Sequence, residues 1–413
     1  MVIYRAREGD TVAAIARRHG VLPTLVCEQN GLTPEAPLKK GQAIVILPPC
    51  ESVQVKEGDS LHSLAARRRI SPAQLKRQNP AIGGGEVLYP GTRLVTSIEE
   101  REHAPLSVLG LSAAGCDPEA LAPTLPYLTY LGIMAAHLLP SGEVSLPDDA
   151  ATVTAAREGG AIPLLVITAS GEGGAEGERE RTEALLSRPD GGGALAERLM
   201  PHLSERGYGG VLLDLPFCNE EHLPAYCTLI ARLRRKLSHR IAVLSTCTPS
   251  GAAARGGTLG RAAGGLLLTT YGIGTRFSSP MPETPYDRLR EAVDEASAAV
   301  RPQKLFAGIS TRALDFPASG GVGRALTYSE LCEAADGAEI CYDPEAHVPY
   351  LAYRGEGGER IAFFEDAESF AEKLLLCERR GLSGICLFPA EGIPRPLLSV
   401  LGGLYPIVRS YGS

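Results

Sequence analysis

The sequence predicts an α/β protein in which a (β/α)8 barrel with a small α+β insertion follows two small βααβ modules. Three observations support this prediction. A unit of about 45 residues is written twice at the start of the 413-residue chain. Apolar runs then alternate with helical stretches through the rest of the chain. One long interval breaks this alternation, and we expect the insertion there.

The repeat defines the first two folding units. Residues 4–12 return as residues 53–61, 49 positions later. Each copy reads strand, helix, helix, strand, because short apolar runs flank two stretches with helical periodicity. In the first copy, Asp10 or Thr11 can cap the first helix, and Pro23 begins the second helix, where its missing N–H has no cost.

The repeated pattern is a strand followed by Glu-Gly-Asp-Thr/Ser, an Ile/Leu-Ala pair, Gln-Asn, and a Gly before an apolar strand. It resembles the LysM module, which binds polymers containing N-acetylglucosamine, and we expect modules at residues 1–49 and 50–97. In that family the sugar lies between the first loop and the loop after the second helix. The resemblance therefore implies these carbohydrate-binding residues: Gly9, Asp10, Thr11, Asn30, Gly31, Leu32, Gly58, Asp59, Ser60, Asn79, Pro80 and Ile82. The alternative is that they are turns and caps needed only for folding.

The large domain is expected at residues 105–413, after a polar linker. Its expected strands are 107–111, 127–134, 162–168, 210–215, 241–246, 265–271, 305–309 and 384–388. Its expected helices include 148–158, 193–206, 220–237, 286–300 and 367–380. A doubly wound open sheet is the alternative, but no glycine-rich phosphate loop follows any of these strands. The glycine-rich stretches 171–177 and 191–193 are expected to be rim loops, and the interval between the last two strands predicts the α+β insertion, at about residues 318–366.

Stretches of the large domain are similar, in order and spacing, to glycoside hydrolase family 18, in its branch of spore-cortex glucosaminidases with paired LysM modules. They are residues 146–149, 163–168, 207–214, 268–271, 304–309, 348–353 and 363–367. This resemblance implies a barrel of the TIM type. It also implies a retaining reaction in which the acetamido group of the substrate attacks the anomeric carbon.

The acidic residues that this reaction needs are incomplete. In the family, the fourth strand ends in an acidic run whose last Glu is the general acid, and the Asp two positions earlier orients the acetamido group. Aligning Asp214 with that Asp puts Pro216 at the acid position. Proline has no proton to donate, and loss of a positioned general acid lowers the rate by about 10²–10⁴-fold. We expect Asp214 to be vestigial or ligand-orienting, and Glu220 and Glu221 to lie in the first turn of the next helix, where acids complement the helix dipole.

Two further positions depart from the family pattern. Tyr271 is followed by Gly272 where the family has Tyr-Asp, and Phe388 replaces the Trp beneath the sugar; the chain has no Trp at all. Phe and Tyr can still stack on a sugar. The resemblance therefore implies a barrel cleft lined by Asp214, Tyr271, Tyr353 and Phe388, without a functional catalytic residue.

Composition excludes several partner classes. The net charge of −7 argues against nucleic acid, and no apolar stretch of about 18 residues predicts a membrane span. The eight His and ten Cys do not cluster at metal-ligand spacing, so we expect no metal, no cofactor and free thiols made in a reducing compartment. No secretory signal is recognisable, which favours deposition in the spore envelope or cell wall from within, with the cytoplasm as the fallback. The sequence makes no prediction of oligomeric state.

The sequence thus favours a peptidoglycan-binding protein of the cell wall or spore envelope whose barrel has lost catalysis. One alternative is an active N-acetylglucosaminidase with a relocated acid, acting on cortex peptidoglycan or chitin-like glycans. A further alternative is a spore-coat assembly scaffold that binds proteins.

Overall fold

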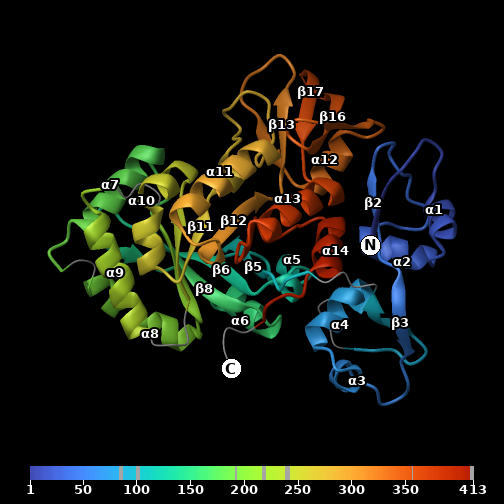
Figure 1. The fold of residues 1–413 in the computed structure, drawn as a ribbon, viewed down its shortest axis with the longest axis horizontal. Helices are drawn as coiled ribbons and strands as arrows, with labels where there is room; N and C mark the ends of the chain where they lie inside the picture. The colour runs from blue at the N-terminus through green and yellow to red at the C-terminus, as the bar shows by residue number, and fades with distance from the viewer. Residues whose placement is uncertain are drawn as a thin grey trace.

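The computed structural model describes residues 1–82, 87–98, 103–190, 193–215, 220–237, 242–355 and 357–409. Pro216 and residues 191–192 lie outside these ranges. A large barrel lies on one side of the molecule and the two small modules on the other, with an antiparallel sheet projecting beyond the barrel (Figure 1).

Each small module is a two-stranded antiparallel sheet packed on two short helices. The first comprises β1 (Val2–Arg5), α1 (Val12–His19), α2 (Pro23–Asn30) and β2 (Ala43–Ile46). The second comprises β3 (Pro49–Gln54), α3 (Leu61–Arg68), α4 (Pro72–Gln78) and β4 (Arg93–Ile98), with the one-turn η1 (Pro80–Ile82) after α4. Thr11 and Ser60 are the N-caps of α1 and α3, because each hydroxyl accepts a hydrogen bond from the backbone N–H of the third helical residue. The βααβ prediction is confirmed.

Eight parallel strands close into a barrel, which confirms the predicted fold class. In hydrogen-bonding order they are β5 (Ser107–Ala113), β18 (Gly384–Phe388), β12 (Leu305–Ser310), β11 (Gly265–Leu268), β10 (Ala242–Cys247), β9 (Gly210–Asp214), β8 (Ile162–Thr168) and β6 (Tyr130–Leu138). The pairing of β5 with β6 closes the ring, and the two-residue β7 (Val144–Ser145) is appended to β6. The barrel interior is filled by apolar side chains such as Leu109, Val166, Leu212 and Phe306.

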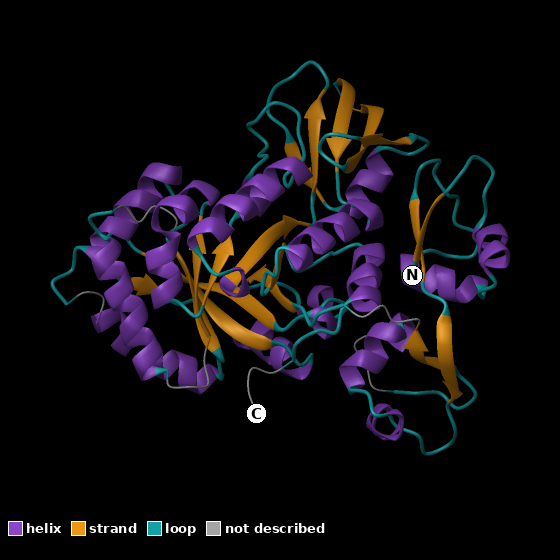
Figure 2. Cartoon of the chain, in the orientation of Figure 1, coloured by secondary structure: helices purple, strands orange, loops and turns teal. Residues whose placement is uncertain are grey.

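Helices surround the barrel (Figure 2). They are α5 (Pro118–Leu121), α6 (Ala150–Glu158), α7 (Gly174–Leu186), α8 (Gly193–Arg206), α9 (Leu223–Lys236), α10 (Pro249–Ala262), α11 (Tyr286–Ala299), α13 (Ala367–Arg379) and α14 (Arg395–Leu404). The short turns η2 (Leu125–Tyr127), η4 (Thr270–Gly272) and η5 (Pro302–Lys304) complete them.

Two sequence expectations about these helices are wrong. Helix α7 begins at Gly174, inside the stretch expected to be a loop. Its position depends on tertiary contacts, because Arg181 donates hydrogen bonds to the carbonyls of Ala169 and Glu172 beside the end of β8. Helix α9 begins at Leu223, so Glu220 and Glu221 lie in the preceding turn and not in its first turn.

The projecting sheet comes from the chain between β12 and β18. It contains β13 (Ala313–Pro317), β14 (Arg324–Leu326), β15 (Ile340–Asp343), β16 (Val348–Gly355) and β17 (Gly358–Phe363), in the antiparallel order β14-β13-β17-β16-β15. Helix α12 (Tyr328–Ala334) covers one face, where Leu331, Leu351 and Ala362 form a small core. The sheet includes residues 313–317, which precede the expected start of the insertion.

The first module is docked on the barrel and on the projecting sheet. The hydroxyl of Ser399 on α14 donates to the carbonyl of Gln29, over 2.7 Å. The backbone N–H of Ile340 donates to the carbonyl of Lys40, over 3.0 Å, so the first residue of β15 contacts the module. Arg5 bonds the N-cap carboxylate Asp366 of α13, over 3.2 Å.

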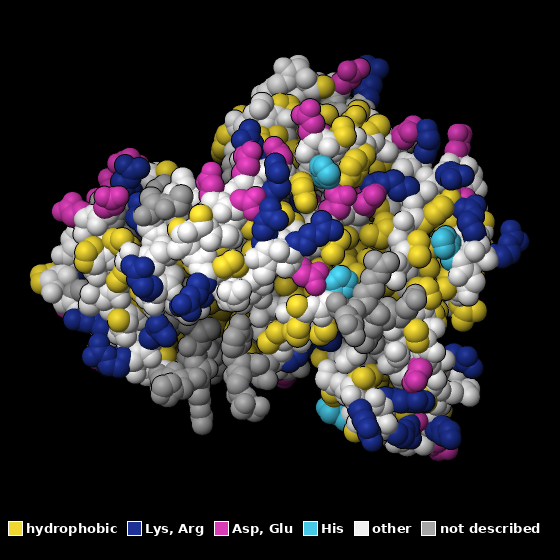
Figure 3. Space-filling model, viewed as in Figure 1, with side chains coloured by type: hydrophobic (Ala, Val, Ile, Leu, Met, Phe, Trp, Pro, Cys, Tyr) yellow, Lys and Arg dark blue, Asp and Glu magenta, His cyan; other side chains and the backbone are white. Residues whose placement is uncertain are grey.

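The second module contacts the opposite end of the barrel wall. Arg77 donates to the carbonyl of Pro126, and the hydroxyl of Tyr127 donates back to the carbonyl of Arg77. On the face drawn in Figure 3, acidic and basic side chains are interspersed over both modules and the barrel. Among the described helices, none combines the length and apolar character needed to cross a membrane.

Candidate functional site

Four strands deliver side chains to one layer at the carboxyl end of the barrel. Side chains alternate inward and outward along a strand. Each of these strands has a buried interior side chain two positions before the residue of interest. The interior residues are Val166, Leu212, Leu244 and Cys386, and the residues two positions later are, in the same order, Thr168, Asp214, Thr246 and Phe388. These four therefore share the inward direction, at the end where barrel proteins place their functional residues.

Asp214 is the last residue of β9, and neighbouring strands contact it. The hydroxyl of Thr168 donates to Oδ2 of Asp214 over 3.1 Å. Burial raises the pKa of the Asp214 carboxyl, although the hydroxyls of Thr246 and Thr168 oppose this shift. The carboxylate of Glu178, on α7, raises the pKa further. The site therefore favours the protonated form of Asp214 more than water does.

Tyr271 lies near Asp214, and its ring packs against that of Phe388. The rings of Tyr271, in η4, and Phe388, at the end of β18, lie 5.0 Å apart between centroids and are tilted by 38°. The Tyr271 ring sits directly on Gly308, where a built Cβ would be 2.3 Å from its Cδ1 atom. Burial raises the pKa of Tyr271, and the nearby Asp214 carboxylate adds to the rise. The structure thus brings Asp214, Tyr271 and Phe388 to the same end of the barrel.

A charged pair that the sequence analysis missed borders these rings. Nη2 of Arg312 lies 2.8 Å from Oε1 of Glu283, and the Arg312 guanidinium lies over the Phe388 ring, 5.0 Å from its centroid. The hydroxyl of Ser310, at the end of β12, donates to the other Glu283 oxygen. Glu283 is only 7% exposed, and burial raises its pKa against the influence of Arg312. The available signal was a polar Ser-Thr-Arg run directly after a barrel strand.

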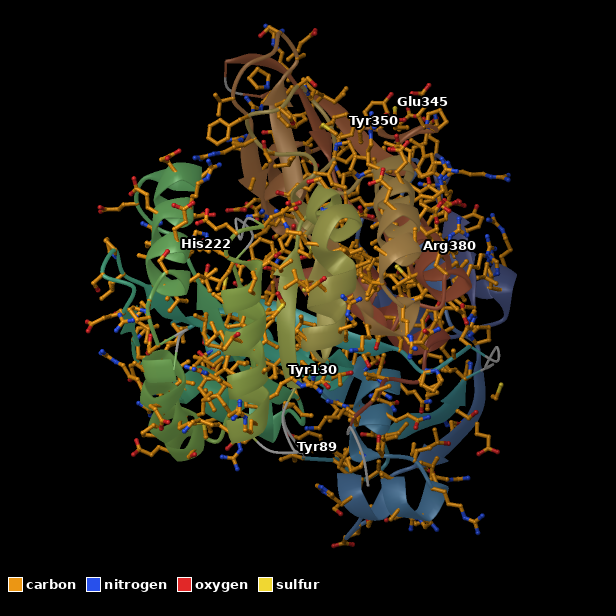
Figure 4. The ribbon with its side chains drawn as sticks, turned by 60° about the vertical axis from the view of Figure 1, so that its left-hand side comes forward. Tyr89, Tyr130, His222, Glu345, Tyr350 and Arg380 are labelled. Atoms are coloured by element: carbon orange, nitrogen blue, oxygen red, sulfur yellow. The ribbon has the colours of Figure 1, made fainter. Side chains whose placement is uncertain are left out.

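Tyr353 lies apart from this group. It is on β16 of the projecting sheet, opposite Arg360 of β17, and packs into the core of the sheet. Figure 4 shows the same separation for its neighbour Tyr350, which lies in the projecting sheet, whereas Tyr130 of β6 lies in the barrel. Tyr353 was expected in the cleft because it belongs to the family-like stretch 348–353, and the structure places that stretch on β16 of the projecting sheet.

Pro216 lies outside the described residues, so its environment is not part of the site geometry. The carboxyl groups closest to it in the described sequence, Glu220 and Glu221, are exposed in the turn before α9. Neither has a hydrogen bond to the four inward residues among the contacts of the described chain.

In the first module, the first loop is exposed but its polar side chains are engaged. Oδ2 of Asp10 accepts from the N–H of Arg7 and the hydroxyl of Tyr4, and Thr11 caps α1. The carboxamide of Asn30 is buried and bonds the N–H and carbonyl of Val45 and the carbonyl of Val26. Asn30 therefore ties α2 to β2, which is a structural use of a residue expected at the sugar.

The second module repeats this arrangement. Oδ2 of Asp59 accepts from the N–H of Lys56, Ser60 caps α3, and the carboxamide of Asn79 joins α4 to β4 through Leu75 and Val95. Identical contacts at equivalent positions explain why Asp and Asn recur in both copies.

The expected sugar positions differ in accessibility. Gly9 and Gly58 have no neighbouring atom within 4 Å of a built Cβ, so both first loops are open. In contrast, a Cβ on Gly31 would lie 3.2 Å from Cβ of Arg395, so this part of the first module faces α14. Leu32 is half-buried, and Pro80 and Ile82, in η1, are also half-buried.

A separate cavity of about 820 Å³ lies between the second module and the barrel. Its charged lining includes Lys76, Glu119, Glu158 and Arg409. Residues 158–160 precede β8, so the cavity is at the amino end of the strands. Because barrel enzymes act at the carboxyl end, this cavity is not the candidate catalytic site.

Comparisons with known proteins agree with this architecture. The LysM domain model matches residues 4–47 and 53–97. The chain is 25% identical over 400 residues to a putative sporulation-specific glycosylase, YdhD, of Bacillus subtilis, covering 93% of this chain and 94% of the relative. It is 23% identical over 414 residues to a cortical fragment-lytic enzyme of Bacillus anthracis, covering 95% and 96%.

Solved structures show the same fold. The spore cortex-lytic enzyme SleL of Bacillus cereus superposes with a TM-score of 0.77 at 22% identity, covering 99% of both chains. A chitinase from Chromobacterium violaceum superposes with a TM-score of 0.62 at 18% identity, covering 72% of this chain and 98% of the chitinase. The chain therefore carries two LysM domains and is a homologue of spore cortex-lytic enzymes with a chitinase-like barrel.

Proposed function

We propose that this LysM-bearing homologue of spore cortex-lytic enzymes binds peptidoglycan, or another glycan containing N-acetylglucosamine, and that its barrel holds glycan without cleaving it. The observation that carries the second part is the sequence Asp214-Leu215-Pro216 at the end of β9. Proline stands where the family resemblance requires the general acid, and its side chain cannot transfer a proton.

The remaining features at the carboxyl end of the barrel suit binding. Tyr271 and Phe388 offer adjoining aromatic surfaces, on which the apolar face of a sugar can pack. Asp214, with its raised pKa and its Thr168 contact, can donate or accept a hydrogen bond to a polar ligand. We assign these residues to ligand binding and none to acid catalysis.

The LysM pair is the proposed wall-binding part. We assign contact with the sugar to the open first loops, around Gly9, Thr11, Gly58 and Ser60, and assign Asn30 and Asn79 to holding the second loops in place. The proposed division is residues 1–49, 50–97 and 105–413, with the insertion at about 318–366. The proposed location is the spore envelope or cell wall, in line with the sporulation and cortex names of the relatives.

Hydrolysis with a relocated acid is the second candidate function. It is favoured by two carboxyl groups near the inward residues, Glu178, which acts electrostatically on Asp214, and Glu283, whose pKa is raised by burial. A raised pKa is the property that a general acid needs. Glu283 is already bound to Ser310 and Arg312, which favours the binding function over this one.

The binding proposal is tested by substitutions that keep each helix cap. Ser60→Asp retains a capping oxygen but adds a negative charge at the open loop of the second module. We expect about tenfold weaker binding to purified, anionic peptidoglycan. Ser71→Asp is the matched control, because Ser71 caps α4 of the same module away from the expected groove. Equal affinities of the two variants would refute the assignment of the first loop.

A further inference from the structure

Arg312 has an unusual position beside the aromatic floor. It follows β12 and reaches over Phe388, with its guanidinium carbon 5.0 Å from the ring centroid. Its side chain keeps 34% of its surface exposed, although its partner Glu283 is almost fully buried. A cation is therefore held over the ring of Phe388, which also packs against Tyr271.

The position of Arg312 is fixed by a connected network. The Arg312 backbone N–H donates to the hydroxyl of Ser310 over 3.2 Å, and the same hydroxyl donates to Glu283. The Ser310 N–H donates to Thr284, next to Glu283 in sequence, over 3.1 Å. Because each member is held by another, the guanidinium is preorganised and loses little freedom when a ligand binds.

The hydrogen-bonding capacity of Arg312 is not used up. Nη2 bonds Glu283, whereas Nε is buried and has no hydrogen-bond partner among the described residues. Because Nε is shielded from solvent, a ligand meets the exposed part of the Arg312 side chain, where a charged donor forms a stronger hydrogen bond than a neutral one. The planar fork of a guanidinium matches the two oxygens of a carboxylate.

We propose that Arg312 binds a carboxylate of the glycan that rests on Tyr271 and Phe388, so that the barrel selects acidic, muramic-acid-type glycans over neutral chitin-type ones. This inference rests on the proposed function of the barrel as a glycan-binding domain. Peptidoglycan offers the carboxylate in two forms, the lactyl group of N-acetylmuramic acid when no peptide is attached, and the peptide carboxyl groups when one is.

The test needs a signal from the barrel alone, because the LysM domains also take glycans. The chain has no Trp, so Phe388→Trp in the full-length protein introduces a single indole under Arg312. The probes are chitotetraose, a peptide-free tetrasaccharide of alternating N-acetylglucosamine and N-acetylmuramic acid, and the same glycan with its peptides. We expect indole fluorescence to report at least about tenfold tighter binding of one or both acidic glycans than of chitotetraose. Comparison of the two acidic glycans, with and without peptides, identifies which carboxylate is bound.

Arg312→Gln in this background should remove the preference, and Arg312→Lys should keep part of it, since lysine retains the charge beside Glu283 but not the fork. Arg276→Gln is the control, because Arg276 also lies over a phenylalanine ring, that of Phe277, outside the barrel floor. Equal affinity for neutral and acidic glycans, or an unchanged preference in Arg312→Gln, would overturn the inference. Absence of any fluorescence change with all three glycans would overturn the barrel-binding function itself, whereas peptidoglycan pull-down reports separately on the LysM domains.

Discussion

The hydroxyl of Thr168 lies 3.1 Å from Oδ2 of Asp214, and the two residues end the adjacent parallel strands β8 and β9. This contact holds Asp214 in a buried layer, between polar hydroxyls and an aromatic ring. We propose that Asp214 orients a ligand, and the family resemblance aligns Pro216 with the proton donor.

Asp214→Asn should stabilise the protein at neutral pH. Because the folded-state pKa of Asp214 is raised, chiefly by burial, the native state binds its proton more tightly than the unfolded state. Wild-type stability therefore falls as the pH rises from about 4 through the folded pKa, by about 1.4 kcal/mol for each unit of elevation. The amide cannot ionise, so denaturant titrations should show the variant more stable than the wild type at pH 7, with no gain below pH about 4.

Asp336→Asn is the control for this pH dependence, because its side chain is 97% exposed and its ion pair with Lys39, at 3.9 Å, lies at the surface. A gain in Asp214→Asn that persists unchanged at low pH would rule out burial of the ionised carboxylate as its cause.

Asn30→Ala and Asn79→Ala should each destabilise their own module. Either change removes one carboxamide and leaves a buried N–H and two carbonyl groups without their partner. Unsatisfied buried groups cost about 1–3 kcal/mol each, so we expect a loss of about 3 kcal/mol or more, measured by chemical denaturation. Glu57→Ala, at an exposed loop position, is the control. Unchanged stability with lost glycan binding would instead identify the asparagines as sugar ligands.

Gly308→Ala should displace Tyr271. The added methyl would lie 2.3 Å from Cδ1 of the tyrosine ring, closer than packed atoms approach, so the ring must move. Overpacking of this kind costs about 1–3 kcal/mol. Near-ultraviolet circular dichroism, free of Trp signal in this chain, should show altered tyrosine bands, and glycan affinity of the barrel should fall. If the tyrosine bands and the glycan affinity are both unchanged, the sugar binds elsewhere.

Gly41→Ala should loosen the first module from the projecting sheet. Gly41 has φ of +85°, and a Cβ there would lie 2.2 Å from the carbonyl oxygen of Ile340. Gly91→Ala supplies the control, since Gly91 is the equivalent residue of the second module, has φ of +92° and has no atom within 4 Å of a Cβ. Both variants carry the backbone strain, and only Gly41→Ala carries the clash. Thermal unfolding and limited proteolysis should show a larger loss of stability for Gly41→Ala than for Gly91→Ala. Equal losses of stability would mean that docking of the first module does not stabilise the protein.

The sequence predicts the barrel well where burial alone decides the structure. The expected strands 162–168 and 384–388 and the helix 193–206 have the observed bounds, because parallel strands are buried on both faces and read as continuous apolar runs. The sequence-based predictions were wrong where tertiary contacts determine the structure. Helix α7 forms through glycine-rich sequence because Arg181 anchors it to the end of β8.

Part of the candidate site could be predicted from the positions of the barrel strands. Asp214 and Phe388 end strands and Tyr271 follows one, and strand ends meet in a closed barrel. Arg312 and Glu283 are 29 residues apart and Glu283 lies in a loop, so only the folded chain reveals their pairing. Tyr353 was expected in the cleft although it lies within residues 318–366, and the structure places it on β16 of the projecting sheet.

The proposed loss of hydrolysis is tested by measuring the release of reducing ends when the purified full-length protein is incubated with spore-cortex peptidoglycan and with chito-oligosaccharides. With proline at position 216, we expect glycan binding and no release above the enzyme-free background. Release at the rate of a cortex-lytic relative assayed alongside it would show that the barrel is an active glycosidase whose acid is another carboxyl group.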